Sequence, residues 1–169
     1  MPHVQLQGRL VTLRPAREGD VRALSAIRES PAVWDRWGGD DIEEEVRESI
    51  DDPELGYLAV LLADQVVGAI QWSESDDPMY RHAGIDIFLS EDVQGQGLGT
   101  EAVRTMAEYL IRERGHHRLV IDPAAHNTAA IRAYEKAGFK PVGVMRQYER
   151  LPGGEWHDGL LMDLLADEL

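Results

Sequence analysis

The 169-residue sequence contains no cysteine and no long apolar run. The absence of cysteine excludes disulfides, thiolate metal ligands and a cysteine nucleophile. Its apolar stretches, such as 58–62 and 65–70, are much shorter than a membrane span, and its first residues lack the basic and apolar pattern of a signal peptide. We therefore expect a cytoplasmic protein that does not associate with membranes.

Basic residues are also scarce. The chain has 17 Lys and Arg residues against 31 Asp and Glu residues, and its formal net charge is −14. Nucleic acids and anionic membranes bind clustered basic side chains, so this composition disfavours both as partners. It favours a cationic ligand, although acidity often serves only solubility. The six histidines show no metal-ligand spacing, and we expect no metal cofactor.

Hydrophobic periodicity predicts one α/β (α+β) domain over residues 1–169. Seven segments are expected as strands, namely 8–14, 57–62, 66–73, 82–89, 118–121, 140–149 and 156–165. Four segments have helical spacing, namely 18–28, 40–50, 98–114 and 127–137. This order predicts a central mixed β-sheet of about seven strands flanked by about four helices. The last strand is a candidate exposed edge that pairs with a second subunit, so both a monomer and a homodimer remain possible.

A glycine-rich segment, VQGQGLGT at residues 93–100, lies between the expected strand 82–89 and the expected helix 98–114. Glycine allows close backbone approach, and a helix N-terminus offers unpaired N–H groups to an anion. The segment is not a P-loop, because no GxxxxGK[ST] occurs in the chain. It is not a dinucleotide fingerprint either, because Thr100 stands in place of the third glycine. We expect a site for the phosphates of a nucleotide-like ligand.

The pattern Gln94-x-x-Gly97-x-Gly99 resembles the pyrophosphate-binding motif of the GNAT superfamily of acetyl-CoA-dependent N-acetyltransferases. Asn127 and Tyr134, seven residues apart in an expected helix, resemble the second cofactor motif of the same family. The resemblance covers essentially the whole chain and implies an N-acetyltransferase that uses acetyl-CoA and no metal.

The resemblance also implies roles for individual residues. Backbone N–H groups of residues 94–100 would hold the pyrophosphate, and residues 87–89 would align the pantetheine arm and polarise the acetyl carbonyl. Tyr134 would be the general acid for the departing thiolate. The implied acetyl-CoA contacts are Ile87, Phe88, Leu89, Gln94, Gly95, Gln96, Gly97, Leu98, Gly99, Thr100, Asn127 and Tyr134.

Two aspartates are candidates for binding the amine that receives the acetyl group. Asp86 lies among apolar residues in the expected central strand, where an unpaired carboxylate would be costly. Asp122 ends the following strand, directly before Pro123. Parallel strand ends form ligand sites, so both carboxylates are expected at one cleft, where they would bind an ammonium group and accept its proton. For Asp122, an Asx turn before Pro123 is an equally good explanation.

These aspartates and the segment Trp37-Gly38-Gly39 resemble the aminoglycoside 6′-N-acetyltransferases. This resemblance implies that Trp37, Asp86 and Asp122 bind a cationic small-molecule amine and that Asp86 and Tyr134 are catalytic. The opening segment 9–15 is equally typical of acetyltransferases that act on ribosomal-protein N-termini, so a protein N-terminus or a polyamine is an alternative acceptor. A non-catalytic acyl-CoA sensor is the alternative of another class, but it would need neither Tyr134 nor Asp86.

Overall fold

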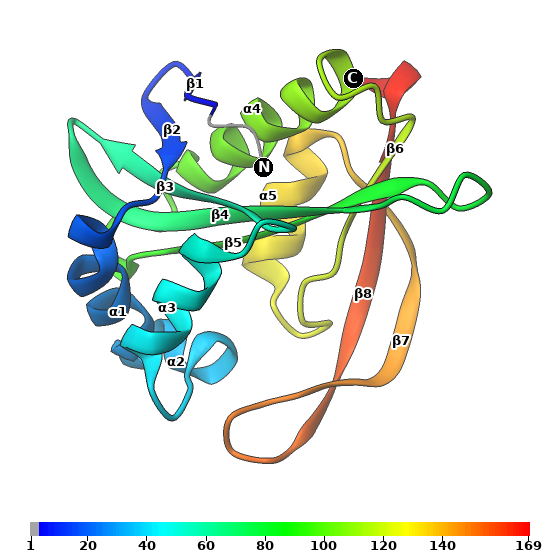
Figure 1. Cartoon of the computed structure of the whole chain (residues 1–169). Helices are drawn as coiled ribbons and strands as arrows, with labels where there is room; N and C mark the ends of the chain where they lie inside the picture. The colour runs from blue at the N-terminus through cyan, green and yellow to red at the C-terminus, as the bar shows by residue number, and fades with distance from the viewer. Residues whose placement is uncertain (1–3) are drawn as a thin grey trace.

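The computed structural model describes residues 4–169, and the eight strands in this range form one sheet with the order β1-β2-β3-β4-β5-β6-β8-β7 (Figure 1). Adjacent strands are antiparallel except β5 and β6, which are parallel. The strands are β1 (Leu6–Gln7), β2 (Val11–Pro15), β3 (Gly56–Leu62), β4 (Gln65–Ser75), β5 (His82–Leu89), β6 (Arg118–Ile121), β7 (Lys140–Arg150) and β8 (Trp156–Leu165).

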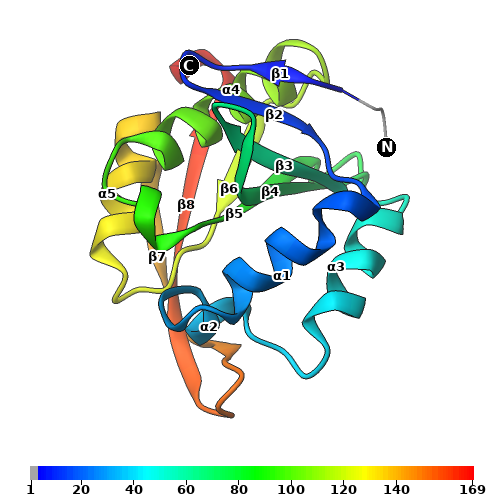
Figure 2. The same cartoon turned by 90° about the vertical axis from the view of Figure 1, so that its left-hand side faces the viewer.

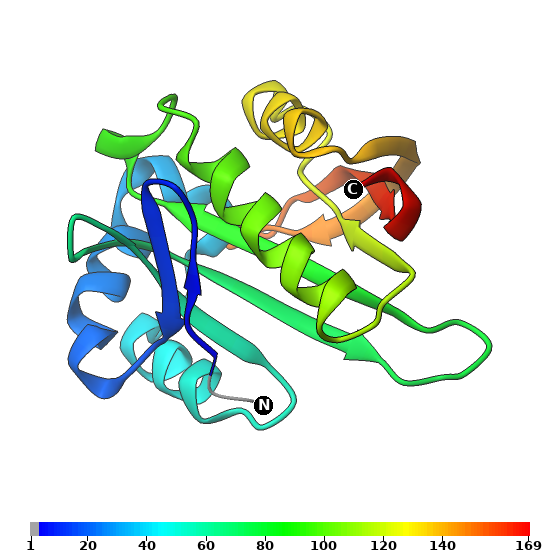
Figure 3. The same cartoon turned by 90° about the horizontal axis from the view of Figure 1, so that it is seen from above.

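Helices cover both faces of the sheet (Figure 2). They are α1 (Val21–Glu29), α2 (Pro31–Trp37), α3 (Ile42–Asp51), α4 (Leu98–Arg112) and α5 (Thr128–Ala137). The helices α1, α2 and α3 pack on one face, and α4 and α5 pack on the other, so that each face buries its own apolar core. Seen from above, α4 runs alongside β5, the strand that precedes it (Figure 3). In the described part of the chain, none of the helices is long and apolar enough to span a membrane.

The expected mixed sheet with flanking helices is confirmed, and the structure adds two short elements to the expected set. One is β1, a two-residue strand that pairs with β2. The other is α2, whose first residue is Pro31. Proline fits the first helical turn, where a backbone N–H has no intrahelical partner. Pro31 therefore ends α1 and starts α2.

The expectation that residues 156–165 form an exposed edge strand is wrong. The strand β8 lies between β6 and β7, and it pairs with both of them in antiparallel register. Its residues Met162 and Leu164 are fully buried, because an interior strand is covered along both edges and on its inner face. The edge strand at this end of the sheet is β7, and the β7–β8 hairpin projects beyond the helices (Figure 1).

The parallel strands β5 and β6 pair over only two positions, Ala83 with Leu119 and Gly84 with Val120. Beyond Gly84, β5 continues for five more residues along β4 alone. Within residues 4–169, the edge of β5 from Ile85 to Leu89 that faces away from β4 therefore has no strand partner. This parting of β5 and β6 opens the middle of the sheet.

Truncation of Leu119 tests the core that holds the two parallel strands together. Leu119 on β6 is fully buried, so we expect Leu119→Ala to lower the free energy of unfolding by about 2–5 kcal/mol. Leu10 is 50% exposed, and Leu10→Ala is the control, with an expected change below about 0.5 kcal/mol. Urea denaturation followed by circular dichroism measures both. Equal losses in the two variants would contradict the assignment of Leu119 to the core.

Candidate active site

The glycine-rich segment forms a tight turn between β5 and α4. Gly95 and Gly97 have φ angles of +75° and +80°, which other residues rarely adopt. Gly97 is the N-cap of α4 and offers no side chain to the N–H groups of the first turn. The turn is fixed to the sheet, because Gln94 Nε2 donates a hydrogen bond of 2.9 Å to the carbonyl of Leu89. The N–H groups of Leu98 and its neighbours are thus oriented as in an anion site.

Helix α5 lies beside this turn and carries Asn127 and Tyr134. Asn127 caps the helix by accepting a hydrogen bond from the N–H of Ala130 at 3.1 Å. Its Nδ2 makes no hydrogen bond within residues 4–169 and is available to a ligand. The two helices are tied together where Thr100 Oγ1 donates to the carbonyl of Ala133 at 2.9 Å. Both the glycine-rich turn and the second motif therefore border the opening between β5 and β6.

Tyr134 is almost fully buried, with 7% of its surface exposed. Burial raises the pKa of its phenol well above the ordinary value, and the phenol lies within electrostatic range of Arg36, Asp86 and Asp122. The positive charge of Arg36 opposes the rise in the pKa, whereas the two carboxylates add to it. The phenol is therefore protonated at neutral pH.

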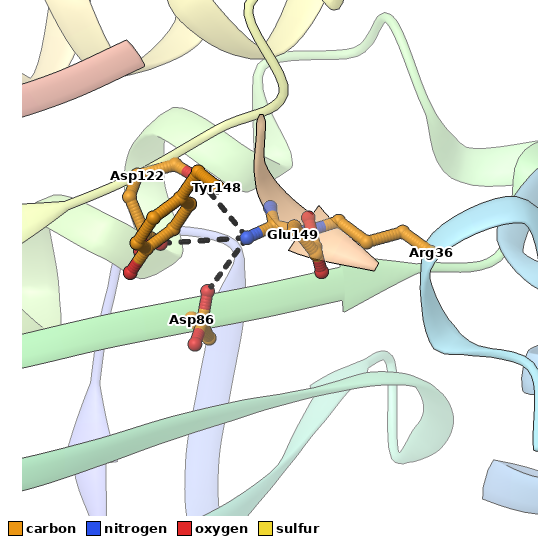
Figure 4. Close-up of polar contacts among 5 residues, drawn as sticks. All are labelled: Arg36, Asp86, Asp122, Tyr148 and Glu149. Atoms are coloured by element: carbon orange, nitrogen blue, oxygen red, sulfur yellow. Dashed lines mark hydrogen bonds and ion pairs between the residues drawn. The ribbon is translucent and has the colours of Figure 1, made fainter. Parts of the chain in front are cut away.

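A cluster of charged side chains occupies the opening of the sheet (Figure 4). Its centre is Arg36 of α2, whose Nη2 lies 3.6 Å from Asp86 Oδ1 and 3.4 Å from Asp122 Oδ1. The same nitrogen donates to the backbone carbonyl of Asp122 at 3.0 Å, and Arg36 Nε lies 3.2 Å from the carboxylate of Glu149. Tyr148 completes the cluster by donating from its hydroxyl to Asp122 Oδ2 at 2.6 Å.

Four separate elements bring these side chains together. Asp86 lies on β5, opposite Gln71 of β4, and Asp122 follows the last residue of β6. Tyr148 and Glu149 come from β7, where Tyr148 lies within a bulge between Met145 and Glu149 and Glu149 ends it. In this bulge, Gln147 has a positive φ of +48°, and its N–H donates to Asp158 Oδ1 at 2.8 Å. The bulge changes the alternation of side chains along β7, and both following side chains reach the cluster.

The electrostatics of the cluster depend on Asp86. Burial raises the pKa of this carboxyl to about 6, the charge of Arg36 lowers it, and the charges of Asp122 and Glu149 raise it further. Tyr148 is coupled to the same group of charges. Its hydrogen bond to Asp122 is the largest of the effects that raise the pKa of the Tyr148 phenol to about 12.

A cavity of about 290 Å³ adjoins the cluster between β4, β5 and β6. Asp86 and Asp122 line one part of it. Five further polar side chains of β4 and β5 line it, together with apolar residues of β4, β5 and β6; the polar ones are Gln71, Ser73, Glu74, Ser75 and His82. The site therefore has two parts: an anion-type turn at the start of α4 and an acidic polar cavity on the other side of the opening.

The structure brings Asp86 and Asp122 together, as the sequence predicted. The Asp122 carboxylate contacts Arg36 and Tyr148, so its polar contacts do not follow the Asx-turn alternative. Trp37, in contrast, packs against an apolar core. Its ring lies 5.0 Å from that of Phe88, between centroids, and it contributes to the apolar core under α1, α2 and α3.

Sequence reasoning missed three members of the cluster, Arg36, Tyr148 and Glu149. Arg36 stands inside the segment WDRWGG, where a basic residue among acidic and aromatic neighbours is the one available signal. Tyr148 and Glu149 carry no such signal, because the bulge that orients them interrupts the alternation of an ordinary strand.

The fold and the turn before α4 agree with a comparison against protein families. The family model described as acetyltransferase (GNAT) domain matches residues 10–140. The chain belongs to the GNAT acetyltransferase family.

Two curated relatives are similar over most of the chain. The aminoglycoside N(6′)-acetyltransferase type 1 of Klebsiella pneumoniae is 33% identical over 159 residues, which cover 80% of this chain and 76% of the relative. The spermidine N(1)-acetyltransferase of Escherichia coli is 25% identical over 158 residues, which cover 90% of this chain and 84% of the relative.

Solved structures show the same fold. AAC(6′)-Ib in complex with paromomycin and acetyl-CoA superposes with a TM-score of 0.76 at 27% identity, covering 94% of this chain and 95% of that chain. The ribosomal L7/L12 α-N-protein acetyltransferase RimL, solved with coenzyme A, gives a TM-score of 0.82 at 20% identity, covering 98% of this chain and all of the other. At that identity the second likeness concerns the fold alone.

The titration of Asp86 gives a test that does not depend on activity. Because the pKa of Asp86 is about 6 in the folded protein and 3.8 ordinarily, folding takes up a proton between these values. The stability of the wild type relative to Asp86→Asn should therefore decrease as pH rises from about 4 to about 6 and stay level above that range. Denaturation of both proteins over this pH series measures the difference. A difference that rose with pH would contradict the raised pKa.

Proposed function

We propose that this protein transfers the acetyl group of acetyl-CoA to the 6′-amine of aminoglycosides. One observation carries the proposal: three carboxylates meet at an opening of the sheet that also faces the anion-type turn of α4. Carboxylates bind ammonium groups, and a helix N-terminus binds phosphate, so the two halves suit a cationic acceptor and a pyrophosphate-bearing donor. The likeness to aminoglycoside 6′-N-acetyltransferases supports this choice.

The residues at the start of α4 fit acetyl-CoA. Backbone N–H groups of residues 94–100 hold the pyrophosphate, with Gly95 and Gly97 allowing the close approach. The unpaired edge of β5 at residues 87–89 offers backbone groups to the pantetheine arm, and Asn127 offers its Nδ2. Acetyl-CoA supplies the activated acetyl thioester.

The chain supplies positioning and proton transfer. Asp86 and Asp122 hold the ammonium group, and Asp86, whose pKa is about 6, takes its proton near neutral pH. The amine nitrogen then bonds to the acetyl carbon as the carbon–sulfur bond breaks, while a backbone N–H of residues 87–89 polarises the carbonyl. Tyr134 donates its proton to the departing sulfur. Its raised pKa keeps it protonated at neutral pH, so its proton is available to the departing sulfur.

The alternative acceptors place different demands on the acidic cavity. A peptide N-terminus brings one ammonium group, whereas the site has three carboxylates that share the single positive charge of Arg36. A polyamine brings several ammonium groups but no hydroxyls to use the Ser73 and Ser75 side chains of the cavity. An aminoglycoside brings both kinds of group, and we therefore favour it. A sensor without catalytic activity would need no buried phenol beside an aspartate of raised pKa.

A thiol-release assay with acetyl-CoA distinguishes these acceptors. The panel contains kanamycin, spermidine and peptides with free N-termini, each at the same series of concentrations. We expect the highest kcat/KM with kanamycin. Turnover of peptides or spermidine with none of kanamycin would reject the proposed acceptor but keep acetyl transfer, and absence of turnover with every amine would support the sensor.

Removal of the Tyr134 hydroxyl tests the general acid. Tyr134→Phe should lower kcat by about 10²–10⁴, the range typical of general acid–base residues, with little change in the Kd for acetyl-CoA. Calorimetric titration measures the Kd, and thiol release measures kcat. Tyr57→Phe is the matched control, because it removes a buried phenol from the other apolar core, outside the cluster. A wild-type rate in Tyr134→Phe would exclude the acid role.

Replacement of Asp86 tests the amine site and its pH dependence. Asp86→Asn should raise the KM for the amine far more than the Kd for acetyl-CoA, because the carboxylate faces the acceptor half of the site. In the wild type, kcat/KM should fall as pH drops below about 6, where Asp86 becomes protonated. Initial rates between about pH 5 and about pH 9, a range that includes the Asp86 pKa of about 6, measure this fall. If kcat/KM of Asp86→Asn shows the same fall at low pH, another titrating group causes it.

A further inference from the structure

The arrangement of acceptors around Arg36 does not match the donors of a guanidinium group. Its Nη2 is surrounded by three oxygen atoms, at 3.0 Å from the carbonyl of Asp122, 3.4 Å from Asp122 Oδ1 and 3.6 Å from Asp86 Oδ1 (Figure 4). A terminal guanidinium nitrogen carries two N–H donors, whereas a primary ammonium carries three. Both hydrogen bonds of Nη2 go to Asp122, and Asp86 Oδ1 lies beyond hydrogen-bond distance, so the third donor of an ammonium group would find an acceptor there.

The charge of the cluster is also incompletely neutralised. Three carboxylates, those of Asp86, Asp122 and Glu149, face a single positive charge on Arg36. The side chains are between 24% and 34% exposed, so the excess negative charge is open to solvent and to a ligand on one side. The cluster therefore has capacity for further cationic groups beyond the one that it already holds.

We propose that Arg36 is an internal substitute for the ammonium group of the acceptor: its guanidinium fills the acidic cleft in the free protein, and the acceptor's amine takes the place of Nη2. This inference rests on the proposed function, in that it treats the cleft as the amine site. It assigns Arg36 a part in selecting the acceptor, by competing with it for the carboxylates.

The surroundings of Arg36 allow this exchange. It lies on α2, a seven-residue helix in which Val33 is buried and the other residues are exposed or half-buried. The long side chain of Arg36 crosses to the cluster, so a change of rotamer withdraws the guanidinium without unpacking the helix. Trp37 keeps the helix on the core through Phe88 during such a change.

The exchange has a consequence for selectivity. An acceptor with one ammonium group replaces one cation by another, so the ion pairs gained are offset by those that Arg36 loses. An acceptor with several ammonium groups also neutralises the carboxylates that Arg36 leaves unpaired, including Glu149. Arg36 therefore makes the wild-type protein discriminate against monoamines and in favour of polycations.

The test compares Arg36→Ala with Arg47→Ala. Arg47 is a matched control, because its guanidinium also contacts three carboxylates (those of Glu18, Glu43 and Glu44) but lies exposed on α3, outside the cluster. One acceptor is kanamycin, and the other is a monoamine sugar, glucose with an amino group in place of its primary hydroxyl. Assays at pH 8 keep Asp86, with its pKa of about 6, ionised.

We expect Arg36→Ala to lower the Michaelis constant for the monoamine sugar by about tenfold, equivalent to ~1.4 kcal/mol, and that for kanamycin by less. Methylguanidinium should inhibit Arg36→Ala competitively with the acceptor and leave the wild type and Arg47→Ala unaffected. If Arg36 instead holds the carboxylates in place for catalysis, methylguanidinium will restore activity to Arg36→Ala, and the proposal is rejected. A rise in both Michaelis constants, or absence of competition, also rejects it.

A binding measurement separates this proposal from the choice of acceptor. If the wild type turns over neither amine, the proposed acceptor fails, and calorimetric titration of methylguanidinium still tests Arg36. If methylguanidinium binds to Arg36→Ala but not to Arg47→Ala, the result supports the exchange of one cation for another. Equal binding to both variants rejects it. Thermal melting verifies the fold, and Arg36→Gln repeats every measurement with a polar side chain of closer size.

Discussion

The parting of β5 and β6 is the constraint on which the site depends. Because the two strands pair over only two positions, β5 presents an unpaired edge from Ile85 to Leu89. Backbone donors and acceptors exposed in the middle of a sheet require a partner. The opening also lets residues from α2 and β7 approach Asp86, which a continuous sheet would cover. The sheet is therefore incomplete at the place where we propose that acetyl-CoA binds.

The two sides of this opening differ in how they are held. The turn before α4 is fixed by hydrogen bonds that its own side chains make, such as that from Gln94 to Leu89, and its free donors are backbone groups. The acidic side consists of three carboxylates that repel one another and share a single arginine as their ion-pair partner. Its arrangement therefore depends on a cation, and the position of that cation determines the charge that Asp86 experiences.

The local parts of the fold and site were predictable from sequence. The strands, the helices and the segments around Gln94 and Asn127 follow from periodicity and from motifs whose members lie within a few turns of one another. The order of β7 and β8 was not predictable, because either strand of a hairpin can become the inner one. The contact between Arg36 and Glu149 was not predictable either, because 113 positions separate the two residues and they meet only in the folded chain.

The division between these sides has an evolutionary consequence. The groups that we propose to face the acetyl donor come from β5, α4 and α5, whose other side chains contribute to the larger apolar core. Of the groups around the proposed acceptor site, Asp86 and Asp122 come from β5 and the end of β6, whereas Arg36, Tyr148 and Glu149 come from α2, a short and lightly buried helix, and from β7, an edge strand with an irregular register. Substitutions in α2 and β7 carry little penalty for the core. New acceptor preferences can therefore arise by mutation in these two segments while the acetyl-transfer chemistry and the stability of the scaffold are inherited unchanged.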